Sequence, residues 1–216
     1  MSAGKSFWEM DELRLVIGAM LILGGATGIL VVLPYLLLED VRPPAGLKPY
    51  TQEQQIGRRS YIANGCMYCH SQQPRDIKQA PDFARGWGRA PVAGDYAYDT
   101  PHLLGTMRTG PDLLNIGARQ PSKDWQLGHL YQPRAYVPGS IMPPYPYLFE
   151  IRQGQAQPND TVVNLPPAFA KPGEVVVAKP EALALVAYLL ALDRTYPALL
   201  PLGKADNSAE AGKDKR

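Results

Sequence analysis

The two cysteines of this 216-residue chain lie in one short run, Cys66-Met67-Tyr68-Cys69-His70. Two thiols three positions apart, with a histidine directly after them, form the attachment signature for c-type haem, because both thiols can make thioethers and the imidazole then reaches the iron. Half of a zinc site or a redox dithiol can show the same spacing, but the chain has no further cysteine and no βαβ pattern around the run. The run therefore predicts one covalently bound haem, attached outside the cytoplasm, with a domain folded around it.

The second constraint is a stretch without charged residues, Val16 to Leu38, which is 23 residues long. As a helix it spans roughly 34 Å, enough to cross a bilayer core of about 30 Å. A cleaved signal peptide is the alternative, but the stretch is too long for its apolar region and no A-x-A site follows it before Glu39. We therefore predict a transmembrane helix over 13–38. Gly24 and Gly28 have the G-x-x-x-G spacing of associating membrane helices, although glycine is common in membrane helices generally.

The remaining segments are divided by composition. A stub over 1–12 precedes the membrane helix, and a proline-rich connector over 39–50 follows it. Charges flanking the helix are balanced, so covalent haem attachment decides the orientation: the stub faces the cytoplasm and the large C-terminal part faces the periplasm. We expect the haem domain over 51–200 and a polar, disordered tail over 201–216.

Two helices are expected at the ends of the haem domain. Thr51 and Gln54 form a T-x-x-Q capping box, which predicts a helix start, and Gly65 ends this helix just before the cysteines. Pro180 begins the second helix and Pro197 stops it. The apolar residues of the second helix that recur at helical spacing are Leu185, Tyr188, Leu189 and Leu192.

The sequence between these helices is rich in proline and glycine and predicts long irregular loops. Two short alternating runs, Tyr96–Tyr98 and Glu174–Val177, predict small strands. Little regular structure is needed in such a domain, because the haem supplies much of its core.

A haem iron that is bound on one side by His70 needs a second axial ligand. Methionine suits electron transfer, because its soft thioether favours the ferrous state. The chain has six methionines. Those in or before the membrane stretch, or between the cysteines, cannot reach the other face of the haem, which leaves Met107 and Met142. Prolines in the run Ile141–Tyr147 would fix the sulfur of Met142 in place.

Four motifs occur in order along the chain: Tyr61–Gln72 around the cysteines, Arg108–Leu113, His129–Arg134 and Met142–Pro146. Their order and spacing, behind one membrane anchor, resemble the membrane-anchored mono-haem subunit II of cbb-type cytochrome c oxidases. The resemblance extends over roughly residues 12–150.

The resemblance implies a mainly α fold, with one N-terminal transmembrane helix and a class I cytochrome c domain with long irregular loops. In that fold the opening helix carries a glycine, here Gly57, and crosses the closing helix closely at a right angle. Gly110–Leu113 resembles the G-P-x-L segment whose proline carbonyl accepts a hydrogen bond from the ligand histidine. The cofactor implied is one covalent, low-spin haem c, with His70 and Met142 as iron ligands. The haem-binding residues implied are Cys66, Cys69, His70, Pro111, Leu113 and Met142.

The resemblance further implies an electron-transfer subunit in the bacterial inner membrane, with no catalytic site of its own. Such a subunit takes single electrons from another c-type cytochrome and passes them to a membrane-embedded haem-copper catalytic subunit. Two alternatives stay open, a free-standing membrane-anchored carrier and the cytochrome subunit of a related nitric oxide reductase. The short, stiff connector disfavours the carrier, because a shuttle needs a long flexible tether.

The other polar features give weaker signals. His102 and His129 would serve a bis-histidine haem, but a lone histidine is more often a packing residue. Six basic residues over Arg58–Arg89 form a local excess, and the net charge of +2 gives no sign of nucleic-acid binding. Ile151–Lys179 is a proline-rich insertion relative to the family, and Trp87 is not expected in every member.

Overall fold

The computed structural model describes residues 12–37, 43–75 and 81–197, and the chain forms two compact units, 1–42 and 43–216. Nearly all of the expected stub, residues 38–42 around the start of the connector, and the expected tail lie outside the described residues. Of the expected connector, residues 43–50 belong to the second unit, where Pro44 and Leu47 are buried.

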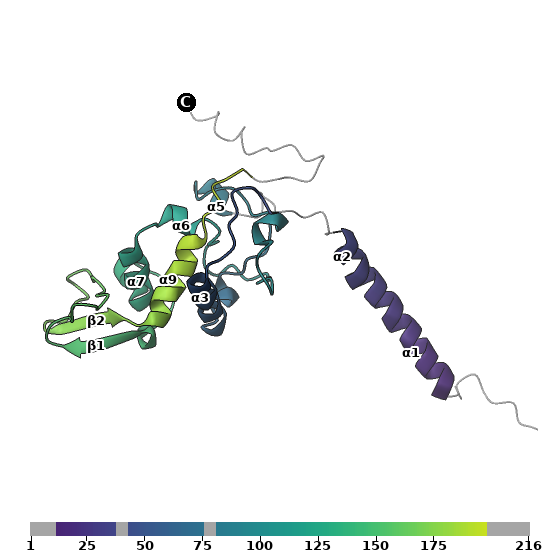
Figure 1. The fold of residues 1–216 in the computed structure, drawn as a ribbon, viewed down its shortest axis with the longest axis horizontal. Helices are drawn as coiled ribbons and strands as arrows, with labels where there is room; N and C mark the ends of the chain where they lie inside the picture. Colours follow the sequence, from purple (N-terminus) through teal and green to yellow (C-terminus); the bar gives the residue numbers. More distant parts are fainter. Residues whose placement is uncertain (1–11, 38–42, 76–80, 198–216) are drawn as a thin grey trace, which may run out of the picture. The chain divides into compact units, whose positions relative to one another are not determined.

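In the first unit, the described residues form one helix that is long and apolar enough to cross a membrane, Glu12–Leu37, with a mean hydropathy of 2.5. It consists of α1 (Glu12–Thr27), a π-helical turn η1 (Gly28–Val32) and α2 (Leu33–Leu37) (Figure 1). The wider turn lies directly before Pro34, whose nitrogen has no hydrogen to donate back along the helix. None of these residues is buried by protein, which is consistent with a single-pass membrane anchor.

The second unit opens with α3 (Gln52–Ala63), which begins where the capping box predicts. The Thr51 hydroxyl accepts a hydrogen bond from the Gln54 backbone N–H, and the Gln54 side chain accepts one from the Thr51 N–H. The helix is followed by Gly65 at a φ of 70°, a left-handed conformation that glycine adopts without strain. The predicted start and end of this helix are therefore both confirmed.

The closing helix α9 (Pro180–Ala191) packs along α3 (Figure 1). Gly57 permits the close approach, because a Cβ atom at this position would lie 1.9 Å from the Ala184 carbonyl oxygen and 2.8 Å from Tyr188 Cβ. The rings of Tyr61 and Tyr188 meet edge to face at 5.5 Å, and both side chains are fully buried. The glycine on α3 thus lies against the closing helix, as the resemblance implies.

Replacement of Gly57 by alanine should lower the midpoint of thermal unfolding of the full chain in detergent. Alanine is the better helix former by about 1 kcal/mol, but overpacking at a contact this tight costs about 1–3 kcal/mol beyond that gain. Gln55→Ala, on an exposed position of the same helix, should change stability by less than about 0.5 kcal/mol. A midpoint of thermal unfolding for Gly57→Ala at or above that of the unmodified chain would contradict this prediction. It would show that α3 and α9 can move apart without loss of stability.

The predicted end of the closing helix at Pro197 is wrong, because α9 ends at Ala191. The Leu192 carbonyl accepts a hydrogen bond from Gly117 N–H, at 2.9 Å, instead of continuing the helix. The Arg194 N–H then donates to Asn115 Oδ1, also at 2.9 Å. Contacts with a distant part of the chain therefore stop this helix before the proline does.

A two-stranded antiparallel sheet is formed by β1 (Phe149–Gln153) and β2 (Glu174–Ala178), with Phe149 opposite Ala178. The predicted strand at Glu174–Val177 is confirmed. The segment Ile151–Lys179, which the sequence predicts to be an insertion, contains the end of β1, the loop that follows it and all of β2. The predicted strand at Tyr96–Tyr98 is wrong.

Tyr96 ends a 3-10 helix, η3 (Ala93–Tyr96), and a turn follows it. Asp95 stabilises this helix because its carboxylate accepts a hydrogen bond from the Val92 N–H at 2.8 Å. The same carboxylate binds Arg89 at 2.6 Å and is fully buried.

Short helices and loops complete the domain and fold around α3 and α9. The helix α7 provides Leu127 and Leu130 to the core, and Leu113 and Met142 pack against that core from loops. The architecture is mainly helical with few strands and long irregular segments, as the sequence predicts. The short elements are α4 (Cys66–Cys69), α5 (Pro81–Ala84), α6 (Ile116–Arg119), α7 (Lys123–Tyr131), α8 (Pro133–Tyr136) and η4 (Pro146–Leu148).

Candidate haem site

The two cysteines lie on α4, a single helical turn that starts at Gly65 and is closed by a hydrogen bond from the His70 N–H to the Cys66 carbonyl. Residues three apart on a helical turn share a face, so both thiols can reach the same ligand. Cys66 is buried beside the core and Cys69 is exposed. The arrangement suits a flat group that enters the core along one edge and keeps another edge near solvent.

The His70 ring is oriented by the segment that the sequence resemblance singles out. Its Nδ1 lies 2.7 Å from the Pro111 carbonyl oxygen. A carbonyl only accepts hydrogen bonds, so Nδ1 carries the proton and Nε2 keeps its lone pair for a metal. The Gly110 N–H donates to the Cys69 carbonyl at 3.0 Å, which ties the same segment to α4.

Gly110 also fits against the imidazole face. A Cβ atom at this position would lie 2.1 Å from His70 Cε1, so no other residue could pack there without moving the ring. Burial lowers the pKa of His70 below its ordinary value, while the hydrogen bond to Pro111 raises it. The ring is therefore neutral at pH 7, which is the form that binds iron.

The two methionines left open by the sequence differ in their surroundings. Met142 is half-buried and packs against the core cluster that includes Cys66. Met107 has 58% of its surface exposed, and its backbone carbonyl accepts a hydrogen bond from the Ser71 hydroxyl at 2.7 Å. The surroundings of Met142 suit an iron ligand shielded from water, and those of Met107 suit a surface residue.

The other two histidines are engaged differently. His102 is exposed. The His129 ring stacks on Trp125 with centroids 4.6 Å apart, and burial lowers the pKa of His129 to about 4. In the described part of the chain, no group of three or more His, Cys, Asp or Glu residues could hold a metal ion.

These residues fit a c-type haem. The donor set consists of two thiols on one turn, an imidazole whose Nδ1 is bound to a carbonyl, and a thioether packed against the same core. Soft sulfur and imidazole are the donors that haem iron takes in electron-transfer proteins.

A family model described as cytochrome c oxidase, mono-heme subunit/FixO matches residues 5–166. The chain belongs to this family. No curated protein matches the chain. The family match covers the membrane helix, the cysteine run and Met142, and it ends in the loop between β1 and β2. The mono-haem subunit assignment establishes a c-type cytochrome of an oxidase complex, so the resemblance derived from the four sequence motifs is confirmed.

Two residues of the mono-haem subunit support the site in ways that the sequence did not reveal. The Tyr61 hydroxyl donates to the His70 carbonyl at 2.6 Å. The Ser71 hydroxyl lies 2.6 Å from the Gly105 carbonyl and so fixes the chain on the other side of His70. These contacts join residues about 9 and 34 positions apart, and no periodicity signals such a pairing.

Several basic residues of the segment 58–89 are paired within the mono-haem subunit. Arg58 is buried and binds Asp99 at 2.7 Å, and Arg89 binds Asp95. The local excess of positive charge in this segment is therefore reduced by ion pairs with carboxylates from the following loop.

Proposed function

We propose that this mono-haem subunit passes single electrons from another c-type cytochrome to the membrane-embedded haem-copper catalytic subunit of its oxidase. In this proposal one haem c, attached to Cys66 and Cys69, supplies the one-electron redox chemistry. The orientation of His70 by Pro111 carries the proposal, because a fixed imidazole is what a low-spin iron site requires.

Each residue has a defined task. His70 would hold the iron through Nε2, and Met142 would hold it through its thioether. The Met142 thioether favours the ferrous state, which raises the reduction potential for a carrier that receives electrons. Leu113 packs beside the core and helps to exclude water from the imidazole side. Full coordination by His70 and Met142 leaves no open position for substrate, so the subunit would have no catalytic site of its own.

The placement of the subunit follows from the same chemistry. Covalent attachment of haem to thiols takes place outside the cytoplasm, so we place the second unit on the periplasmic side of the bacterial inner membrane. The helix Glu12–Leu37, at about 39 Å, is long enough to anchor the chain in a single pass.

Gentle detergent purification of the tagged full chain tests this function. We expect recovery of a larger membrane protein with b-type haem and copper, and oxygen uptake by the recovered complex. A matched chain with Cys66→Ser and Cys69→Ser should show no c-type haem and at least a tenfold loss of oxygen uptake that depends on cytochrome c. Recovery of the unmodified chain alone, as a single low-spin c-type haem, would instead support the membrane-anchored carrier. Nitric oxide reduction without oxygen uptake would support the reductase alternative.

A further inference from the structure

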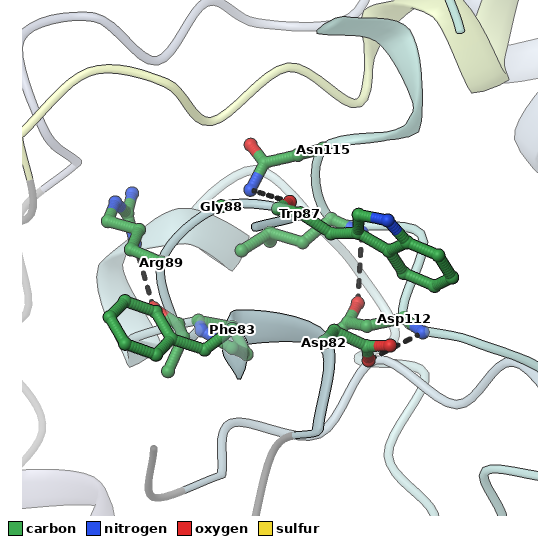
Figure 2. A pocket seen from close by; sticks show the side chains of 10 residues that line it. Asp82, Phe83, Trp87, Gly88, Arg89, Asp112 and Asn115 are labelled. Carbon is green, nitrogen blue, oxygen red and sulfur yellow. Dashed lines mark hydrogen bonds between the residues drawn. The ribbon is translucent and has the colours of Figure 1, made fainter. Parts of the chain in front are cut away.

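Trp87, which the sequence left without a role, is fixed beside the segment that contacts His70 (Figure 2). Its backbone N–H donates to the Asp82 carbonyl at 3.0 Å, and its carbonyl accepts a hydrogen bond from Asn115 Nδ2 at 3.4 Å. The Asp112 N–H donates to Asp82 Oδ2 at 3.0 Å. The loop that carries Trp87 is therefore hydrogen-bonded to Asp112, in the histidine-orienting segment, and to Asn115 just after it.

Two guanidinium groups lie over the Trp87 ring. Arg119 Cζ lies 4.1 Å from the ring centroid, and Arg85 Cζ lies 5.0 Å from it. Arg85 is exposed and pairs with Asp82 at 3.5 Å. Arg119, the last residue of α6, is half-buried, and within the described residues its guanidinium group makes no hydrogen bond or ion pair. The indole face thus holds a guanidinium group whose N–H donors stay available.

The charges around Trp87 do not balance. Arg85, Arg108 and Arg119 face two carboxylates, those of Asp82 and Asp112. Arg108 binds Asp112 at 2.6 Å, and Arg85 binds Asp82. Burial lowers the pKa of Arg119, although both carboxylates raise it, so their charge does not offset the loss of hydration. The described residues place no anion in direct contact with the Arg119 guanidinium group, so this half-buried cation can accept one.

Arg119 is also linked by contacts to the iron ligand proposed above. It stacks on Trp87, whose backbone N–H is bound by Asp82. The Asp82 carboxylate accepts a hydrogen bond from the Asp112 N–H, directly after the Pro111 carbonyl that contacts His70. The Arg119 guanidinium group would therefore attract an anion bound on this side of the domain.

We propose that Arg119, held flat on Trp87, binds a carboxylate group of the haem. Its planar donors match both oxygens of a carboxylate, which a lysine ammonium cannot do. This proposal rests on the proposed function, because only a bound haem would supply this carboxylate. Trp87 is a positioning residue that acts through Arg119.

The test is a redox titration of the full haem-loaded chain in detergent. Arg119→Gln should lower the equilibrium constant for reduction roughly tenfold, as Coulomb's law gives for a unit charge about 10 Å away at an effective dielectric constant near 20. Arg119→Lys should recover most of this loss. Arg85→Gln removes the same charge from beside the same indole, but it should change the constant less than about twofold because that side chain is exposed.

Infrared difference spectra between the oxidised and reduced forms give a second readout. The carboxylate bands of the haem should shift in Arg119→Gln and in Trp87→Leu and stay unchanged in Arg85→Gln. If Arg119→Gln does not accumulate, Trp87→Leu still tests the proposal, because it removes only the platform. Identical reduction potentials and identical carboxylate bands in Arg119→Gln and Arg85→Gln would overturn the proposal that Arg119 binds the haem carboxylate. An intact low-spin spectrum in both variants would still leave the proposed function standing. An unmodified chain without covalent haem would overturn both.

Discussion

His70→Ala should abolish the low-spin haem spectrum of the full chain, even if the thioethers to Cys66 and Cys69 still form. The imidazole is the strongest ligand in the set, and its Nδ1 is held 2.7 Å from the Pro111 carbonyl, which leaves the Nε2 lone pair available to bind a metal. Alanine leaves the iron without its nitrogen ligand, and the core loses the ring against which Gly110 packs. Absorption spectra of the purified chain should show high-spin haem, and the yield should fall severalfold.

His102→Ala is the matched control, because it makes the same chemical change at an exposed histidine. It should keep the low-spin spectrum and the yield of the unmodified chain. His129→Ala should also remain low-spin, although loss of the stack on Trp125 will lower its stability. Loss of the low-spin spectrum in either of these variants, with its retention in His70→Ala, would show that a different histidine binds the iron.

Local signals in the sequence predicted the elements that frame this site. The capping box at Thr51 places the start of α3, and Gly65 at a positive φ ends the helix just before Cys66. Both signals depend only on neighbouring residues, since a cap satisfies the backbone donors of its own first turn. For the same reason the start of α9 after Lys179 could be read from Pro180.

Features that depend on distant residues were harder to predict. The alternation at Tyr96–Tyr98 looks like a strand, but Asp95 binds Arg89 and the Val92 N–H and so favours a 3-10 helix. The end of α9 is set by Gly117, which lies far away along the chain. Strand β1 was not recognised, because its pairing with β2 brings together residues on either side of a long loop.

The residues of the candidate site also divide into those that local motifs predict and those that depend on contacts between distant segments. The cysteine run and the Gly110–Leu113 segment could be recognised as motifs, and the hydrogen bond between His70 and Pro111 has the expected geometry. The support from Tyr61 and the stacking of Arg119 on Trp87 could not be predicted, because each joins segments about 9 to 32 positions apart through side chains. Motifs identify groups that touch the cofactor, whereas the residues that hold those groups are found only in the fold.

Met142→Leu should lower the reduction potential of the haem and remove the weak ferric sulfur-to-iron absorption band. Leucine has nearly the volume of methionine, so the packing against the core is kept while the sulfur ligand is lost. Without the thioether the ferrous state is less favoured, and we expect a fall of roughly 0.1 V or more, within the range of about 0.8 V that axial ligands span. Redox titration and ferric absorption spectra of the full chain measure both changes.

Met107→Leu provides the control, because it removes a thioether from the other methionine that the sequence left as a candidate. Met107 has 58% of its surface exposed, and its backbone carbonyl accepts a hydrogen bond from Ser71. This variant should keep the band and the potential of the unmodified chain. If Met107→Leu removes the band and Met142→Leu keeps it, the sulfur ligand is Met107. The chain between Ser71 and Met107 must then cross to the face of the haem opposite His70. The comparison therefore decides between the two methionines.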